Sequence, residues 1–325
     1  MKRRLRWVLH VVLAALGILA VVLLVRHVGA RQLLEAMKQC APVLPIVFAL
    51  EMVRTMTDAW RTQLLYDRSG KHVPMRRVLP VQIAAYPMTL FLPAGGAASE
   101  AYKAAVLARD VTAPVAAAAA TTNQALQLFA VFVVSIPCTI VAYLVWGMSG
   151  FTAAIIVQAL TAIGLAIAIQ IATRHRLLGA LAAKVSTKAG AAVDSHRDAV
   201  RVLSFVPMRP LFAAITSRIA QLIQVGLLVV FAGATPWLSS SFLALGVQLV
   251  SGAAGDLVPA QIGATDASFA LAAKPLGIDQ ARALSIAMAM HVVQIGWALL
   301  ALLLGLRQPR RVEVVEEEAP VIRVS

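Results

Sequence analysis

Charged residues are scarce in this sequence of 325 residues. Asp, Glu, Lys and Arg make up 14% of it, whereas an ordinary soluble domain contains about 25%. Hydrophobic residues account for 60%, and the mean hydropathy is +0.81. The apolar runs are continuous rather than alternating, which excludes an outer-membrane β-barrel. The composition therefore predicts an all-α polytopic membrane protein rather than a soluble one.

Cysteine is almost absent, and the familiar catalytic motifs are missing. The two cysteines, Cys40 and Cys138, lie in or near apolar segments without metal-ligand spacing, and we expect both to be small buried side chains. The sequence contains no HExxH, no nucleophile elbow, no phosphate-binding glycine loop and no paired CxxC. We therefore expect no metal, no cofactor, no ATP hydrolysis and no enzymatic activity. Any transport would be downhill or driven by an ion gradient.

Acidic residues are outnumbered by basic ones, 15 to 29, which gives a net charge of +14. Much of the excess lies in a few short loops, which indicates membrane topology and contact with anionic lipid rather than nucleic-acid binding. A basic start precedes the apolar run Trp7–Val25, which is longer than the core of a cleaved signal peptide. We expect an uncleaved first span, then an external interfacial helix over Arg26–Ala41. The expected location is the bacterial cytoplasmic (inner) membrane, with both termini in the cytoplasm.

Two stretches interrupt long apolar regions with helix-breaking residues. Both stretches have the same order of residue types. An apolar residue, a proline and an alanine come first, a polar residue or glycine and several small residues follow, and a hydroxyl residue and an acid end the stretch. The helix-breaking residues are Pro93, Gly95 and Gly96 in the first stretch and Pro259 and Gly263 in the second. In lipid, the backbone groups freed by such a break need partners, so it survives only inside protein or beside a water-filled cavity. Two breaks in corresponding places indicate a transporter site built from repeats.

The basic loops decide whether these broken regions cross the membrane. If residues 78–109 crossed it once, the spans 121–146 and 151–173 would leave the basic segment that follows on the outside, against the positive-inside rule. We therefore predict a re-entrant helical hairpin over 78–109 that opens from the cytoplasm. The arginines after the final span should also lie in the cytoplasm. This requirement fixes the number of membrane crossings before that span, and it predicts a second re-entrant hairpin over 242–276 that opens from outside.

The chain then divides into two halves of opposite orientation. We predict about six full transmembrane helices plus two oppositely oriented hairpins in an inverted repeat, with a site near the midplane between the broken helices. The predicted divisions are 1–41 for the first transmembrane helix and the interfacial helix, 42–173 for the first half, 174–209 for a basic cytoplasmic amphipathic linker, 210–306 for the second half and 307–325 for a disordered cytoplasmic tail.

Four charged residues lie on one face of the predicted span 42–66. They are Glu51, Arg54, Asp58 and Arg61, at spacings of 3, 4 and 3. Charges inside a span usually face the bundle interior and pair, since each costs at least about 2.5–3.5 kcal/mol at the bilayer centre. One interpretation is an ion-pair ladder in which Arg61 reaches the cytoplasmic surface. The other, compatible with it, is that Arg54 and Arg61 hold an anionic headgroup, with Glu51 and Asp58 as proton-coupling candidates.

Further polar residues lie in or beside the predicted hairpins and spans. Fixed cations and helix amino termini suit a phosphate. The predicted substrate-binding residues are Arg54, Arg61, Lys103, Arg218, Glu100, Asp266, Asn123 and Gln261. Glu100 and Asp266 are expected in the first turn of the second helix of each hairpin, where an acid either caps the helix or binds a cationic headgroup or a proton. Asp256 and His291 are further proton-coupling candidates, although a lone histidine in a span can equally be hydrogen-bonded packing.

Three short motifs resemble those of one membrane family. The run from Leu92 to Arg109 resembles the "LPG-x-x-GE-x-x-RAYLLAR" signature of the lysylphosphatidylglycerol synthase transmembrane (flippase-like) family. Residues 258–267 are similar to its "PGGLGVREA" motif, with Ala260 and Gln261 in place of glycines and an aspartate in place of glutamate. Residues 58–65 are similar to its "WR-x-x-LL" segment. The resemblance covers residues 7–306.

The resemblance implies a lipid flippase or transporter that moves a polar-headed lipid, anionic or phosphate-containing, between leaflets. The lipid would be an anionic phospholipid, an isoprenoid phosphate or a hopanoid-type lipid. A second hypothesis is a membrane-embedded lipid-carrier transferase in which Glu100, Asp256 and Asp266 are catalytic. A third is a non-transporting partner that recruits lipid- or envelope-biosynthesis enzymes through the basic surface 174–207. A homo-oligomer is also compatible with the sequence, and we expect no nucleic-acid partner.

Overall fold

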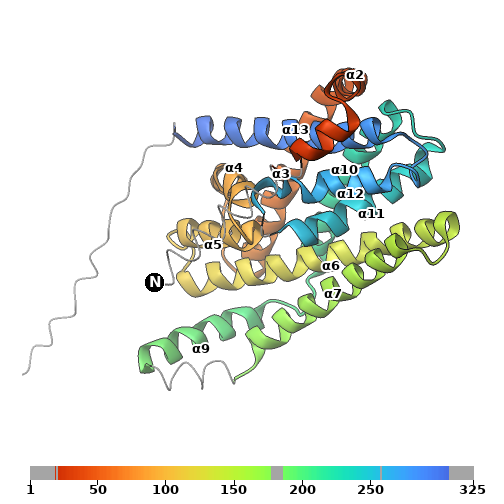
Figure 1. Ribbon diagram of the computed structural model, residues 1–325. Helices are drawn as coiled ribbons and strands as arrows, with labels where there is room; N and C mark the ends of the chain where they lie inside the picture. The colour runs from red at the N-terminus through yellow and green to blue at the C-terminus, as the bar shows by residue number, and fades with distance from the viewer. Residues whose placement is uncertain (1–18, 20, 177–185, 257, 307–325) are drawn as a thin grey trace, which may run out of the picture.

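The described part of the chain is helical (Figure 1). The computed structural model describes residues 19, 21–176, 186–256 and 258–306, and no strand occurs within them. In these ranges, six helices are long and apolar enough to cross a membrane. The predicted all-α polytopic class is therefore confirmed. Most of the predicted first span and the whole of the predicted tail lie outside the described residues.

The first well-described elements form one bent helical run. Helix α2 (Ala30–Cys40) continues through the 3₁₀ turn η1 (Ala41–Val43) into α3 (Leu44–Arg68). Helix α2 is amphipathic, burying Leu33 and Cys40 while Arg31 stays exposed, and it packs against the last helix. A helix was predicted here; its position at a membrane surface stays a prediction.

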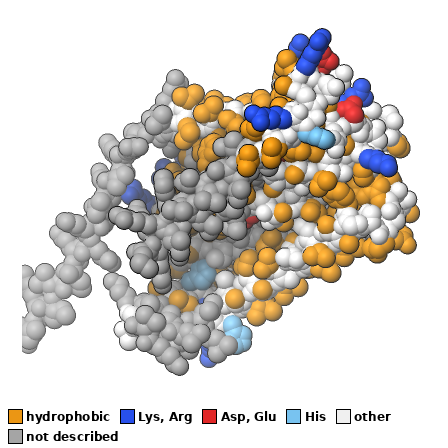
Figure 2. All heavy atoms as spheres, in the orientation of Figure 1, with side chains coloured by type: hydrophobic (Ala, Val, Ile, Leu, Met, Phe, Trp, Pro, Cys, Tyr) orange, Lys and Arg blue, Asp and Glu red, His pale blue; other side chains and the backbone are white. Residues whose placement is uncertain are grey.

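Two long antiparallel helices form one side of the molecule. They are α6 (Ala113–Trp146), which contains the predicted span 121–146, and α7 (Gly150–Arg174). Helix α9 (Thr187–Val202) packs against both. Large apolar side chains of this pair, such as Leu144 and Val157, are exposed, as expected of surfaces that face lipid tails. Figure 2 shows hydrophobic side chains over most of the visible described face, with charged side chains gathered around α2.

The two predicted halves have the same order of elements. In the first, α3 is followed by the shorter helices α4 (Met75–Phe91) and α5 (Gly95–Leu107) and then by α6. In the second, α10 (Met208–Phe231) is followed by α11 (Trp237–Gly255), the 3₁₀ turn η2 (Pro259–Gln261), α12 (Ala264–Ala272) and α13 (Gln280–Leu306). In Figure 1, α4 and α5 lie toward the end of the molecule where α9 lies, and α11 and α12 lie toward the opposite end. This arrangement agrees with an inverted repeat; the re-entrant course of the short helices stays a prediction.

The two helix breaks are joined by a main-chain hydrogen bond. Ala94 and Ala260, each directly after a proline, have left-handed backbones with φ of 50° and 54°, a conformation that costs a non-glycine residue roughly 1–2 kcal/mol. The backbone N–H of Ala94 donates to the carbonyl of Asp256, at 3.0 Å. One correction concerns the first break: α5 begins at Gly95, so Gly95 and Gly96, predicted to break the helix, lie in its first turn.

The apolar interior has two main clusters, and α6 contributes to both. One cluster joins Val134 and Cys138 of α6 to α10–α13, including the fully buried Phe269. The other joins Leu126 of α6 to α3–α5, including Leu65. Both cysteines are buried and free, as predicted. The polar groups described next lie where α3, α4, α5, α6 and α10 meet between these clusters.

Candidate functional site

Glu51 is the centre of a hydrogen-bonded group between three helices. Its carboxylate accepts hydrogen bonds from Arg54 at 2.7 Å, from the Tyr86 hydroxyl of α4 at 2.8 Å and from the Gln224 amide of α10 at 2.9 Å. Glu51 is only 4% exposed. A buried charge is tolerated when it is paired and hydrogen-bonded, so this group fixes the Arg54 guanidinium at the boundary between α3 and α10.

Arg61 forms a second ion pair two turns further along α3. Its guanidinium lies 3.1 Å from the carboxylate of Asp58, and its Nε donates to the side-chain oxygen of Asn123 on α6. Arg61 is 2% exposed. The interpretation that Arg61 reaches the cytoplasmic surface is therefore wrong, because the acceptor on α6 holds it in the interior. The charged stripe of α3 forms two separate pairs, Glu51–Arg54 and Asp58–Arg61.

Glu100 and Lys103 form a buried ion pair on α5. The Lys103 ammonium lies 2.6 Å from the Glu100 carboxylate and also donates to Gln82 of α4 at 2.8 Å. The Asn123 amide donates to Glu100 at 2.7 Å, which joins this pair to Arg61. Glu100 was predicted in the first turn of its helix, where it could cap it. Since α5 begins at Gly95, Glu100 lies in the second turn and neutralises Lys103 instead.

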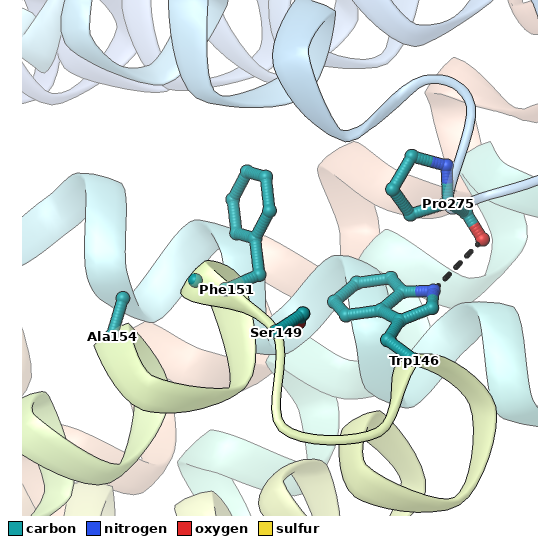
Figure 3. Close-up of a pocket in the computed structure, with 6 residues that line it drawn as sticks. Trp146, Ser149, Phe151, Ala154 and Pro275 are labelled. Atoms are coloured by element: carbon teal, nitrogen blue, oxygen red, sulfur yellow. Dashed lines mark hydrogen bonds between the residues drawn. The ribbon is translucent and has the colours of Figure 1, made fainter.

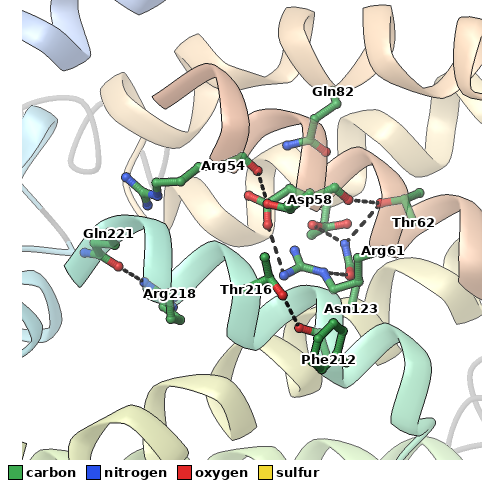
Figure 4. A network of polar contacts seen from close by, with 12 residues as sticks. Arg54, Asp58, Arg61, Thr62, Gln82, Asn123, Phe212, Thr216, Arg218 and Gln221 are labelled. Atoms are coloured by element: carbon green, nitrogen blue, oxygen red, sulfur yellow. Dashed lines mark hydrogen bonds and ion pairs between the residues drawn. The ribbon is translucent and has the colours of Figure 1, made fainter. Parts of the chain in front are cut away.

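Arg218 is held by an amide rather than by a carboxylate in the part of the chain that the structure describes. It lies on α10, where it donates to Gln221 at 2.7 Å (Figure 4). It also lies close enough to Arg54, Asp58 and Arg61 of α3 to interact with them electrostatically. Within the described residues, Arg218 has no carboxylate in ion-pair distance. Arg54 Nε and Arg61 Nη2 are also buried without a hydrogen-bond partner there.

The balance of charge in this region is positive. Four cations, Arg54, Arg61, Lys103 and Arg218, are brought together with three carboxylates, those of Glu51, Asp58 and Glu100. An uncompensated cation in a span is costly. Free N–H donors on guanidinium groups suit a phosphate or carboxylate. The site can therefore accept one anionic group between α3 and α10.

The second half holds its acid differently. On α12, Asp266 Oδ2 accepts the backbone N–H of Gly263 at 2.8 Å and lies 3.2 Å from His291 Nε2 of α13. The expected capping role of Asp266 is thus observed. Gln261 has a left-handed backbone and packs against Gly255 of α11. Asp256 is exposed at the end of α11, beside the first break.

The structure therefore divides the predicted site residues into two groups. Arg54, Arg61, Arg218, Lys103, Glu100 and Asn123 belong to one connected region, and Glu51 and Asp58 complete it. Asp266 and His291 form a separate pair, with Gln261 and Asp256 on the adjoining break. Sequence reasoning did not assign Tyr86, Gln82, Gln221 or Gln224 to a site. Their spacing could have identified them, because polar residues one turn apart in an apolar helix lie on the same face.

A pocket lies outside this region, at the loop between α6 and α7 (Figure 3). Trp146, Phe151, Ala154 and Pro275 are among its lining residues, and Trp146 Nε1 donates to the Pro275 carbonyl at 3.2 Å. Its lining is mostly apolar and includes no charged side chain. It therefore offers no charged side chain that could pair with an anionic headgroup.

Comparison with known proteins agrees with the motifs. A family model described as "Lysylphosphatidylglycerol synthase TM region" matches residues 7–303. No curated protein and no solved structure matches the chain. The match spans both helix breaks and every residue of the site described above.

Proposed function

Since the chain belongs to the family of the lysylphosphatidylglycerol synthase transmembrane region, we propose that it carries an anionic, phosphate-bearing lipid headgroup between the two leaflets. The family and the apolar helices make it a multi-pass membrane protein of lipid metabolism or transport. A lipid that changes leaflet must take its headgroup through hydrocarbon. A polar site inside the protein lowers that barrier while the tails stay in lipid.

The observation that carries this proposal is the unpaired Arg218. Three of the four cations in the region have a carboxylate partner, and Arg218 does not among the described residues. Evolution rarely leaves an ionisable group in a span without a functional partner. A phosphate bound between Arg218 and Arg54 would supply the missing negative charge and accept from the free Arg54 Nε.

Reconstitution tests this proposal. In liposomes, we expect the protein to move fluorescently labelled anionic lipids, such as phosphatidylglycerol, faster than a labelled neutral glycolipid. Arg218→Ala should reduce that rate by about tenfold or more, the cost of one charge-assisted contact of about 1.5–3 kcal/mol. Arg209→Ala removes an exposed arginine from the same helix and should leave the rate unchanged. Equal rates for Arg218→Ala and Arg209→Ala would contradict the proposed site.

We also propose that the protein is a transporter and not an enzyme. Glu100 and Asp266, two of the acids that a lipid-carrier transferase would use, are engaged with Lys103 and with the start of α12. Incubation of the liposomes with lipid carriers should therefore yield no covalently changed lipid. A new lipid product that depends on Asp256, the exposed acid, would favour the transferase instead.

The proposed orientation places both termini in the cytoplasm of a bacterial inner membrane. The end of the molecule that includes α9 holds a group of arginines, among them Arg68, Arg77, Arg174 and Arg201. At the opposite end, loops 147–149 and 232–236 carry no charge, and the segment 273–279 carries one lysine and one aspartate. This asymmetry follows the positive-inside rule. Reporter fusions at the carboxyl terminus would test it. Anionic phospholipid, isoprenoid phosphate and hopanoid-type lipids remain the proposed partners, with self-association as a further one.

A further inference from the structure

A carboxylate and an imidazole meet in the interior of the second half. Asp266 has no exposed surface, and His291 is 7% exposed. Asp266 Oδ2 lies 3.2 Å from His291 Nε2, and it accepts a hydrogen bond from the backbone N–H of Gly263 at 2.8 Å. The pair thus ties the start of α12, and with it the second helix break, to α13.

Each partner also has one buried polar atom without a hydrogen bond among the described residues. These atoms are Asp266 Oδ1 and His291 Nδ1. A bare Nδ1 suits the neutral imidazole with its hydrogen on Nε2, because an N–H at that position would be buried without an acceptor. A buried carboxylate oxygen without a donor is instead an open position for a proton. Oδ1 is therefore the atom at which an added proton removes a buried charge.

The pair is separate from the other titratable groups around it. The neighbouring helices α4 and α10, the end of α11, the loop before α13 and the first turn of α13 contribute Tyr86, Arg218, Asp256, Lys274, Asp279 and Arg282. Tyr86 and Arg218 bond to Glu51 and Gln221, and Arg282 pairs with Asp279. The charges of α2 and α3 lie in the pairs already described or near the helix ends. Within the described residues, none of these groups bonds to Asp266 or His291.

We propose that Asp266 and His291 form a proton-binding site that couples lipid movement to a proton gradient, an inference that rests on the proposed function. A proton passes from water on one side of the membrane to Asp266 Oδ1, where an O–H bond forms and the carboxylate loses its charge. It returns to water on the other side. Neutral Asp266 accepts more weakly from Gly263 and His291, because charge-assisted hydrogen bonds are about twice as strong as neutral ones. Protonation therefore loosens the start of α12.

A continuous set of contacts joins this pair to the anion site. His291 and Trp297 lie on the same helix, α13, and the Trp297 ring packs edge-on against Tyr86, with centroids 6.3 Å apart. The Tyr86 hydroxyl donates to Glu51, the partner of Arg54. A shift of α13 that follows protonation would thus reach the Glu51–Arg54 pair. This contiguity is spatial, and the experiment must show the coupling.

Transport under an imposed pH gradient tests the coupling. In liposomes loaded with a pH-sensitive dye, we expect the wild type to move labelled phosphatidylglycerol about tenfold faster with the gradient than without it, within the usual range for coupled sites. Proton movement should accompany it. Asp266→Asn and His291→Gln should bring that ratio to one. Asp198→Asn makes the same chemical change at an exposed position on α9 and should keep the wild-type ratio.

A second measurement is independent of transport. Infrared difference spectra of the reconstituted protein, taken across about pH 5–8, the range in which histidine-linked sites act, should show one buried protonated carboxyl band. Asp266→Asn should remove this band and Asp198→Asn should keep it. Asp266→Glu should shift it.

The outcomes separate the two proposals. Lipid movement that ignores the gradient, or a gradient effect that survives in Asp266→Asn, overturns the proton site and leaves the lipid carrier intact. No movement of any labelled lipid contradicts the proposed function and, with it, the coupling. In that case the infrared band still decides whether the pair binds a proton, and its absence from the wild type rules that out too.

Discussion

The two helix breaks share a sequence pattern but use their acids differently. In both, a left-handed alanine follows a proline, and an acid lies seven residues after that proline. Helix α5 begins directly after Ala94, so Glu100 lies in its second turn. Helix α12 begins only after the 3₁₀ turn 259–261, so Asp266 lies in its first turn. A difference in the length of the break therefore changes the task of the acid.

The chemistry of each half follows from this difference. Glu100, set back by one turn, reaches Lys103 and Asn123 and becomes part of a set of fixed charges. Asp266, at the helix start, holds the Gly263 N–H and faces His291, the side chain suited to proton exchange near neutral pH. Under the two proposals above, one half supplies the charges that bind the headgroup, and the other supplies the proton-binding pair beside the second break.

Removing the acid from the first half should have the largest effect on stability. Glu100→Gln leaves the buried Lys103 without its carboxylate, which costs about 3–5 kcal/mol. The double variant Glu100→Gln/Lys103→Met should recover most of that loss. Unfolding in detergent, followed by thermal shift, would measure both. A double variant no more stable than Glu100→Gln would show that the pair is not the source of the loss.

The matching change in the second half should cost less. Asp266→Asn keeps an oxygen that can accept from Gly263, and it leaves no lysine unpaired. We expect a loss of about 1–2 kcal/mol, the range for a weakened helix cap. The same thermal-shift measurement applies. A loss as large as that of Glu100→Gln would mean that the two acids have equivalent structural roles, which would contradict the contrast between the two breaks.

The two adjacent glycines at the first break should differ in their tolerance of a side chain. A Cβ on Gly95 would lie 2.1 Å from the carbonyl oxygen of Thr89, whereas a Cβ on Gly96 would meet only the Gln124 side chain at 3.7 Å. Gly95→Ala must therefore push α4 and α5 apart, at a cost of about 3 kcal/mol. Gly96→Ala should be neutral or stabilise by up to about 1 kcal/mol. Equal melting temperatures for the two variants would contradict the close packing of α4 on α5.

The smallest expected effect is a gain in stability from a glycine at either break. Ala94→Gly and Ala260→Gly each relieve a left-handed alanine and should stabilise the protein by about 1 kcal/mol. Ala98→Gly, inside α5, should instead destabilise it by about 1 kcal/mol. Urea unfolding of the three variants would show the sign of each change. Destabilisation by Ala94→Gly would mean that the turn is not strained.

Much of the fold could be predicted because local rules determine it. The apolar run of α6 indicated a membrane-spanning helix that ends at Trp146, and the Pro-Ala pairs indicated both breaks, since proline and glycine act on the backbone where they stand. The short motifs around residues 58–65, 92–109 and 258–267 likewise indicated the family, and the family model confirms it.

The site was less predictable because it depends on contacts between distant helices. The spacing on α3 indicated pairing, but only the position of Asn123 on α6 explains why Arg61 stays buried. Likewise, Glu100 was misplaced by one turn, because the left-handed Ala94, which starts α5 early, is not visible in residue identity. The partners of Glu51 on α4 and α10 lie 35 and 173 positions away, beyond any local pattern.

The hydrogen bond from Ala94 to Asp256 has a mechanical consequence. It fastens the bend of one half to the bend of the other by their main chains. At the membrane midplane predicted for the breaks, parting them would leave an amide and a carbonyl without partners, at a cost of several kcal/mol for each. The two breaks should therefore move as one unit. A movement that opens the site toward one leaflet should close it toward the other leaflet.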